Sequence, residues 1–303
     1  MRFVSSPTAA VAALLFVATG AVAQDQDNAQ NNAPVFRDVE TKYIFGFTEG
    51  SGIGLEGEKE FSLDTEAKIG KRDGRYWASE TKFEYEFTPS QYVQFELGPF
   101  MSIDSIHNVT GFDDQSQVGF GGVFGEIRYL LLDRSAGQPL SVTLSLEPEW
   151  RRIGDNGGEH ENSFELEAKV NADVELIKNR LYLGSNLLYE PEATRDPDGI
   201  GAGWEMESMG GVSGALSYRI TPSVFIGGEV WYLRHYAGAW FNEFEGDAVY
   251  VGPTLFVQLN PKMFISVAWN VQVDGSEEDN PDAGLNLEEF SHNRAKFKFA
   301  VEF

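Results

Sequence analysis

The chain contains no cysteine, so it forms no disulfide framework and offers no thiolate to a metal ion. It also lacks any run of about 20 apolar residues, the length that a transmembrane helix needs. Basic residues are scarce, because 23 lysines and arginines stand against 47 aspartates and glutamates. A chain this acidic repels nucleic acid, which excludes nucleic acid as a partner.

The first residues have the three parts of a secretory signal peptide. Residues 1–2 are a short basic start, residues 9–19 are apolar, and residues 21–23 read Ala-Val-Ala, a typical cleavage site. The apolar run is too short to span a bilayer as a helix. Residues 1–23 are therefore predicted to be a signal peptide. Residues 24–33 are rich in Gln, Asn and Asp, a composition typical of disorder.

Polar and apolar side chains alternate through most of residues 57–303. In the first such run, Phe61, Leu63 and Thr65 alternate with Ser62 and Asp64, and the same period of two returns up to the final run at 291–303. An amphipathic helix would instead show apolar residues three and four apart. We expect about twelve strands. Most runs are about 13–16 residues long, whereas strands of soluble sandwiches usually have five or six, and about 9–11 suffice to cross a membrane.

The lengths of the connections support a membrane barrel. Tight turns follow the second, sixth, eighth and tenth runs, at 88–90, 178–179, 221–223 and 260–262. Longer connections follow the third, seventh, ninth and eleventh runs, up to the segment 274–290. Short turns on one side and long loops on the other are typical of the periplasmic and extracellular ends of a barrel. The predicted fold is an all-β, antiparallel, up-and-down transmembrane β-barrel over residues 57–303.

Residues 24–56 precede this barrel and have no clear alternation. We interpret them as a periplasmic N-terminal segment. Their aromatic part, residues 35–54, leaves three arrangements open: an extra strand, a plug in the lumen, or packing at the mouth of the lumen.

The last residues of the chain carry a resemblance. Apolar side chains at Ala295, Phe297, Phe299, Val301 and Phe303 alternate with Lys296, Lys298, Ala300 and Glu302. This pattern resembles the final strand of Gram-negative outer-membrane β-barrel proteins, although Val301 stands where such strands often carry an aromatic residue. The resemblance implies export to the outer membrane, contact with its lipid and lipopolysaccharide, and recognition by the barrel-assembly machinery through Phe297, Phe299, Val301 and Phe303. Channels, enzymes, adhesins and receptors share this fold, so the fold does not determine the function.

The side chains expected to face the lumen carry charges of both signs, with acids in excess. The predicted pore-lining residues are Glu80, Lys82, Glu84, Glu86, Glu147, Glu149, Arg151, Glu165, Glu167 and Lys169. Carboxylates along a pore favour positive solutes. The sequence therefore predicts passive diffusion of small polar solutes, cationic or neutral, without a cofactor. The same charges could instead pair across the lumen and close it.

Two other functions stay open at this stage. The first is an enzyme acting on lipid or lipopolysaccharide, which would need one of His107, His160, His235 and His292 beside a serine and a carboxylate. The second is a non-conducting structural or adhesive barrel, with its lumen blocked by ion pairs or by residues 35–54. The carboxylate-rich loops lack EF-hand spacing, so we predict no metal site. We also predict no catalytic residue and no enzymatic activity.

Overall fold

The computed structural model describes residues 40–134, 139–195, 203–278 and 280–303. The predicted signal peptide and the segment 24–39 lie outside the described residues. No helix in the described ranges is long and apolar enough to cross a membrane. Twelve strands are present: β1 (Lys59–Ile69), β2 (Arg75–Ser90), β3 (Val93–His107), β4 (Gln115–Leu132), β5 (Leu140–Ile153), β6 (His160–Ile177), β7 (Leu181–Arg195), β8 (Glu205–Thr221), β9 (Val224–Ala237), β10 (Glu243–Asn260), β11 (Met263–Glu277) and β12 (Asn293–Glu302).

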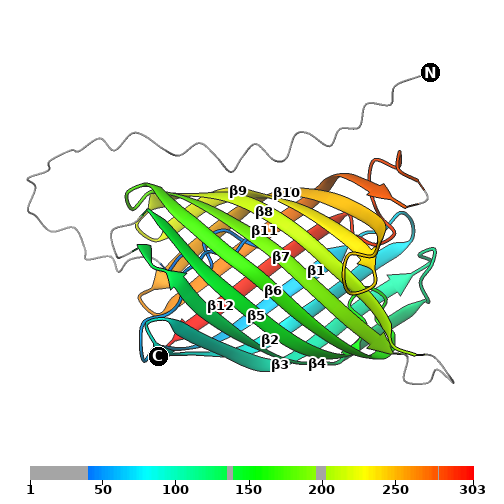
Figure 1. The fold of residues 1–303 in the computed structure, drawn as a ribbon, viewed down its shortest axis with the longest axis horizontal. Helices are drawn as coiled ribbons and strands as arrows, with labels where there is room; N and C mark the ends of the chain where they lie inside the picture. The colour runs from blue at the N-terminus through cyan, green and yellow to red at the C-terminus, as the bar shows by residue number, and fades with distance from the viewer. Residues whose placement is uncertain (1–39, 135–138, 196–202, 279) are drawn as a thin grey trace, which may run out of the picture. The chain divides into compact units, whose positions relative to one another are not determined.

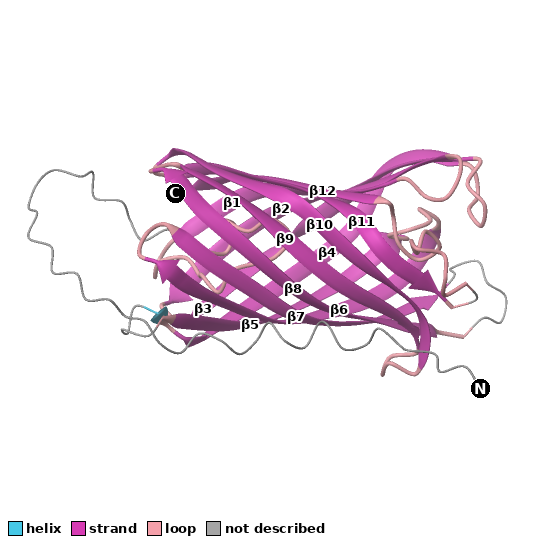
Figure 2. Ribbon diagram, turned by 90° about the horizontal axis from the view of Figure 1, so that it is seen from above, coloured by secondary structure: helices cyan, strands magenta, loops and turns pink. Residues whose placement is uncertain are grey.

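The strands form one closed antiparallel barrel. Each strand pairs with its neighbours in sequence, and β12 returns to pair with β1, with Phe61 opposite Val301 and Thr65 opposite Phe297. The strands run obliquely around the barrel, as closure of a sheet requires (Figure 1). A view turned by 90° shows the same oblique strands, with loops at both ends (Figure 2). The predicted all-β, twelve-stranded, up-and-down barrel is confirmed.

Alternation sorts the side chains between two surfaces. On β2, Glu84 and Glu86 are 3% and 4% exposed because they point into the lumen, whereas Trp77 is 41% exposed on the outer wall. Large apolar residues such as Leu187 and Leu216 are likewise exposed on the outside. An apolar outer wall around a polar interior is the reverse of a soluble protein and is typical of transmembrane barrels.

The two ends of the barrel differ. At the end that holds the C-terminus, strands are joined by residues 91–92, 178–180, 222–223 and 261–262. At the other end the connections include residues 108–114, 154–159 and 278–292. The first end is therefore periplasmic and the second extracellular. The predicted long connection after the ninth strand is wrong: only residues 238–242 join β9 to β10, because β10 begins at Glu243, six residues before the alternation at Val249.

Aromatic rings lie on the outer wall near both ends. Tyr85 contacts Phe87 and Phe303 at the periplasmic end, with ring centroids 6.1 and 6.4 Å apart. Trp150 contacts Phe120 towards the extracellular end, at 6.3 Å. Such rings settle at the level of lipid headgroups, so the two bands mark the edges of the membrane-spanning part.

Candidate functional site: the charged lumen

The lumen contains a cavity of about 270 Å³ whose wall is dominated by charge. Sixteen carboxylate side chains line it, against eight lysines and arginines, so the wall is acid-biased overall. These side chains come from strands all around the barrel because every inward position of a β-strand faces the same interior.

The structure places most of the predicted pore-lining residues on this wall. Eight of the ten line the cavity: Glu80, Lys82, Glu84, Glu147, Arg151, Glu165, Glu167 and Lys169. Glu86 points inward but is covered, because it accepts hydrogen bonds from Lys42 and from the Tyr43 hydroxyl at 2.7 and 2.8 Å. Glu149 is 4% exposed and is held between Lys82, at 2.9 Å, and Arg151. Conduction past these side chains stays a prediction.

Basic side chains on β2 and β5 are neutralised by acids beside them. Lys82 forms ion pairs with Glu147 and Glu149, which connect β2 to β5 across the lumen. Arg151 pairs with Glu80 at 2.8 Å and contacts Glu165 at 3.4 Å. This network narrows the lumen on one side and leaves little free positive charge there.

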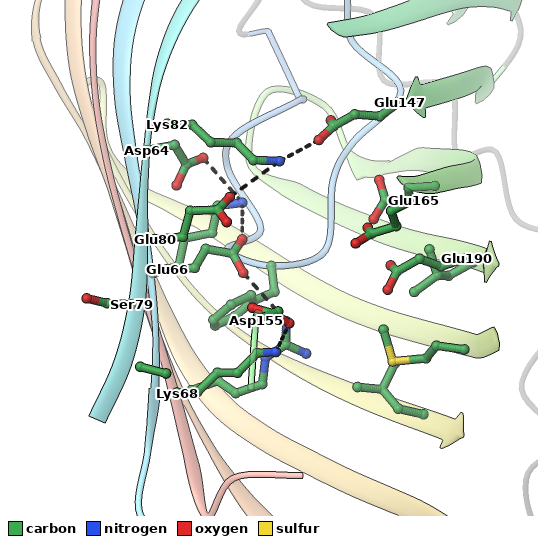
Figure 3. Close-up of a pocket in the computed structure, with 18 of the residues that line it drawn as sticks. Asp64, Glu66, Lys68, Ser79, Glu80, Lys82, Glu147, Asp155, Glu165 and Glu190 are labelled. Atoms are coloured by element: carbon green, nitrogen blue, oxygen red, sulfur yellow. Dashed lines mark hydrogen bonds and ion pairs between the residues drawn. The ribbon is translucent and has the colours of Figure 1, made fainter. Parts of the chain in front are cut away.

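The side of the cavity formed by β6 and β7 carries one carboxyl group, Glu190, that has no ion-pair partner within the described residues. Figure 3 shows Glu147, Glu165 and Glu190 facing Glu66 and Lys68 across the cavity. Glu190, on β7, makes no hydrogen bond or ion pair within the described part of the chain, although it lines the cavity. The wall formed by β6 and β7 therefore presents carboxylates to any solute that enters.

Residues 40–58, here called the N-terminal hairpin, enter the lumen from the periplasmic end and return to it. At its tip the chain is turned rather than extended, and the two arms are joined by a hydrogen bond from Gly50 N to Lys42 O at 3.1 Å. The second arm ends at the periplasmic end, where Gly57 N donates to Thr88 O at 2.8 Å. Tyr43 and Phe45 are buried against inward rings of the barrel. The sequence left three arrangements open for residues 35–54: an extra strand, a plug in the lumen, or packing at the mouth of the lumen. The described part, residues 40–54, lies inside the lumen.

Ion pairs hold the hairpin on one side of the lumen. The Lys42 ammonium lies 2.7 Å from Glu86, 2.9 Å from Glu96 and 3.7 Å from Glu126, carboxylates of β2, β3 and β4. In return, Glu49 pairs with Arg128 and, at 2.7 Å, with Lys169. Charges in the hairpin and in the barrel are thus complementary.

Two buried carboxylates bind the backbone of the hairpin elsewhere on the wall. Glu229 on β9 accepts hydrogen bonds from the N–H groups of Phe47 and Thr48, at 3.1 and 2.7 Å. Asp173 on β6 accepts from the Thr41 hydroxyl and from Ser51 N, both at 2.7 Å. Sequence reasoning missed these partnerships; the unusual Lys42 within an aromatic segment was the one signal for them.

The longest extracellular connection folds inward over the lumen. Within residues 278–292, Asn286 is fully buried and its carbonyl accepts a hydrogen bond from Gln272 at 2.8 Å. Phe290 is buried among inward residues of β7, β9, β10 and β11, and the Tyr250 hydroxyl donates to Ser291 O at 2.5 Å. The cavity is therefore bounded by this loop on the extracellular side and by the hairpin on the periplasmic side.

Lys71 is expected to make the docking of this loop depend on pH. Its ammonium donates to Glu288 O at 2.6 Å and lies over the rings of Tyr76 and Phe112. Burial lowers the pKa of Lys71 from 10.5 to about 8, and the neighbouring Lys68 acts in the same direction. At a pH between 8 and 10.5, Lys71 keeps its proton when the loop is undocked and loses it when the loop is docked. Docking should therefore strengthen as pH rises from 8 to 10.5, by about 1.4 kcal/mol per pH unit.

Hydrogen exchange of residues 284–291, corrected for the intrinsic rate, measures this effect. We expect protection to increase across that pH window in the parent chain and to stay flat in Lys71→Met, which has no titrating group. An equal increase of protection with pH in both proteins would rule out Lys71 as the origin of the pH dependence.

The four histidines are not brought together. His107, His160 and His235 lie on β3, β6 and β9, and His292 precedes β12. The His235 ring contacts Glu245 at 2.9 Å and Glu207 at 3.3 Å. Within the described ranges no histidine is hydrogen-bonded to a serine, and no group of three His, Asp or Glu side chains is arranged to hold a metal ion. The arrangement that the enzyme hypothesis requires is not found there.

Comparison with known proteins completes the description. A family model, described as "Family of unknown function (DUF6662)", matches residues 38–303. The chain belongs to DUF6662. No curated protein sequence matches this DUF6662 chain.

Solved structures share the fold of the DUF6662 barrel. The COG4313 outer membrane channel from Pseudomonas putida F1 has a TM-score of 0.54 and 10% identity, covering 83% of this chain and 97% of that one. The NanC porin has a TM-score of 0.47 and 11% identity, covering 80% and 98%. The translocator domain of the autotransporter NalP from Neisseria meningitidis has a TM-score of 0.48 and 11% identity, covering 83% and 89%. The fold is that of Gram-negative outer-membrane β-barrel proteins.

Proposed function

We propose that this barrel is a passive outer-membrane channel for small polar solutes, cationic or neutral, that works by diffusion and without a cofactor. The observation that supports this proposal is the charge of the cavity, in which carboxylates outnumber basic side chains by sixteen to eight. An excess of fixed negative charge lowers the barrier for cations and raises it for anions. A structure of the same fold is named an outer membrane channel, which agrees with this role.

Different parts of the wall have different tasks in this channel. Glu165, Glu167 and Glu190, on β6 and β7, attract a positive group. Lys82 and Arg151 hold the facing carboxylates in place through ion pairs and narrow the path. A neutral polar solute exchanges its hydration for hydrogen bonds to the same side chains.

The hairpin makes this a channel with a gate. It fills the periplasmic side of the lumen, so a through-path requires that it move. Both of its arms lie at the periplasmic end, and it contacts the wall through hydrogen bonds, ion pairs and packing of buried apolar side chains such as Phe45. It can therefore be withdrawn as a unit without breaking the strand ladder. The same hairpin also favours the second candidate function, a non-conducting structural or adhesive barrel, in which it never leaves.

The remaining partners follow from this location. We propose that the outer wall contacts outer-membrane lipid and lipopolysaccharide, and that Phe297, Phe299, Val301 and Phe303 on the outside of β12 are recognised by the barrel-assembly machinery. Phe297 and Phe303 are 45% and 59% exposed, so both rings are available on the outer wall.

Reversal potentials in planar bilayers test the proposed selectivity. Under a salt gradient, the parent chain should show the sign of cation preference, with cations preferred roughly several-fold. Replacement of three wall carboxylates by glutamine, in Glu165→Gln/Glu167→Gln/Glu190→Gln, should shift the potential measurably towards zero, because it removes three of the sixteen acids against eight basic side chains.

The matched control removes three carboxylates that are exposed and do not line the cavity, in Glu56→Gln/Glu205→Gln/Glu243→Gln. It should retain the parent potential, because screened charges outside the lumen contribute little. Anion preference in the parent chain, or an equal loss in both triple variants, would contradict the proposal.

A further inference from the structure

One arginine on the outer wall, Arg234, makes no hydrogen bond or ion pair with any other described residue. Arg234 lies between Leu233 and His235, both of which line the lumen, so its own side chain faces outward. It sits near the extracellular end of β9, with Gly210 of β8 and Asp247 of β10 directly opposite in the ladder. Its side chain is partly buried and lies on the same outward face of β9 as Tyr232 and Tyr236.

Aromatic rings surround the guanidinium group. Its central carbon lies 4.4 Å from the ring centroid of Phe244 and 5.2 Å from that of Tyr236. Such contacts stabilise a cation and also fix its orientation. These contacts use the face of the planar group, so the N–H donors of its two terminal nitrogens stay available for another partner.

The connection between β9 and β10 closes over this site. Phe241 packs against Tyr236 and Tyr189, each with ring centroids 5.0 Å apart, and Trp240 stacks on Tyr189 while remaining 77% exposed. Gly210 makes room for the Phe241 ring, since a Cβ at position 210 would lie 2.9 Å from Phe241 Cε1. The exposed indole is typical of a ring at the headgroup level of a membrane.

Asp247, directly opposite Arg234 in the ladder, forms no ion pair with it within the described residues. One oxygen of Asp247 accepts from the Tyr232 hydroxyl at 2.9 Å, and the other accepts from Ser276 N and its hydroxyl at 2.9 and 2.8 Å. Within the residues that the structure describes, Arg234 makes no ion pair or hydrogen bond, and its Nε is buried without an acceptor. An arginine beside lipid is energetically unfavourable unless an anion binds it.

We propose that Arg234 and its surrounding rings bind the phosphate group of an outer-leaflet lipid. A phosphate matches the planar fork of a guanidinium, which binds two of its oxygens at once. The acyl chains of the same lipid lie along the apolar outer wall below Arg234, where Val230 of β9 and Leu187 of β7 are exposed. This site is independent of conduction, so it stands or fails separately from the proposed channel.

Lipid binding to the purified, folded protein in detergent tests the site by native mass spectrometry. The probes are lipid A with both phosphates, dephosphorylated lipid A, and inorganic phosphate. The parent chain should bind phosphorylated lipid A, Arg234→Gln should bind it about tenfold more weakly, and Arg234→Lys should be intermediate because it keeps the charge but not the fork. The matched control is Arg152→Gln, which removes an exposed arginine of β5.

Each outcome bears on the proposal. A loss that is specific to Arg234→Gln, in a variant that keeps the heat-dependent gel shift of a folded barrel, supports it. Equal binding by Arg234→Gln and the parent overturns it, as does equal binding of dephosphorylated lipid A. Inorganic phosphate binding as tightly as phosphorylated lipid A would also overturn it, since the site would then serve a free anion.

Discussion

Deletion of residues 40–55 should raise single-channel conductance in planar bilayers by at least about tenfold over the full chain. The hairpin occupies the periplasmic side of the lumen, and its removal leaves the strand ladder from Lys59 onward unchanged. The carboxylates that it leaves behind, such as Glu86 and Asp173, would then face water in an open lumen, so their loss of partners is offset by hydration.

A disulfide lock provides the matching control for this deletion. The hydroxyls of Thr48 in the hairpin and Ser213 on β8 lie 3.0 Å apart, and the chain has no cysteine of its own. Thr48→Cys/Ser213→Cys should therefore form one defined disulfide that holds the hairpin in place. Oxidised protein should stay closed, and reduction should restore the parent behaviour.

These variants separate the two candidate functions. Stepwise currents from the parent chain and from the deletion variant, absent from the oxidised lock, support a gated channel. Currents from the deletion variant alone indicate a barrel that its hairpin keeps closed. If neither variant conducts while both migrate as folded barrels, the non-conducting barrel is the correct function. If the locked protein conducts as well as the deletion variant, the hairpin is not the gate.

The barrel could be predicted from sequence because its information is local. Alternation along a run such as Phe61 to Ile69 shows which side chains face lipid and which face the lumen, whatever the partner strand is. Turn residues at 88–90 and 260–262 then show which end is periplasmic. Closure follows because an open sheet edge would leave backbone N–H and C=O groups unpaired in lipid, so no long-range information is needed.

The contents of the lumen could not be predicted in the same way. Glu86 was correctly placed on the inward face, but its partner Lys42 lies 44 positions away in a segment without periodicity. Thr48 and Glu229 are 181 positions apart. Alternation shows that a side chain points inward, and it does not show whether water or another part of the chain meets it there. The rings around Arg234 were missed for a related reason, since the connection at 238–242 supplies part of them.

A single substitution at Gly46 should release the hairpin while every charge stays in place. Gly46 has a φ of 94°, a conformation that a β-branched residue rarely adopts. An added Cβ would lie 2.7 Å from Thr254 Cγ2 and 2.8 Å from both Ala268 Cβ and Glu229 Oε1. Backbone strain and overpacking together should weaken docking of the hairpin in Gly46→Val by about 3 kcal/mol or more.

Each 1.4 kcal/mol changes an equilibrium about tenfold, so the open population should rise by roughly 100-fold and approach the behaviour of the deletion variant. Gly214→Val on β8 is the control, because a Cβ there meets no atom within 4 Å. Both proteins should keep the heat-dependent gel shift of a folded barrel, since neither substitution removes a ladder hydrogen bond. Closed channels in Gly46→Val, with residues 40–58 still protected from hydrogen exchange, would show that steric fit does not hold the gate. Open channels would show that the ion pairs of Lys42 and Glu49 cannot keep it shut alone.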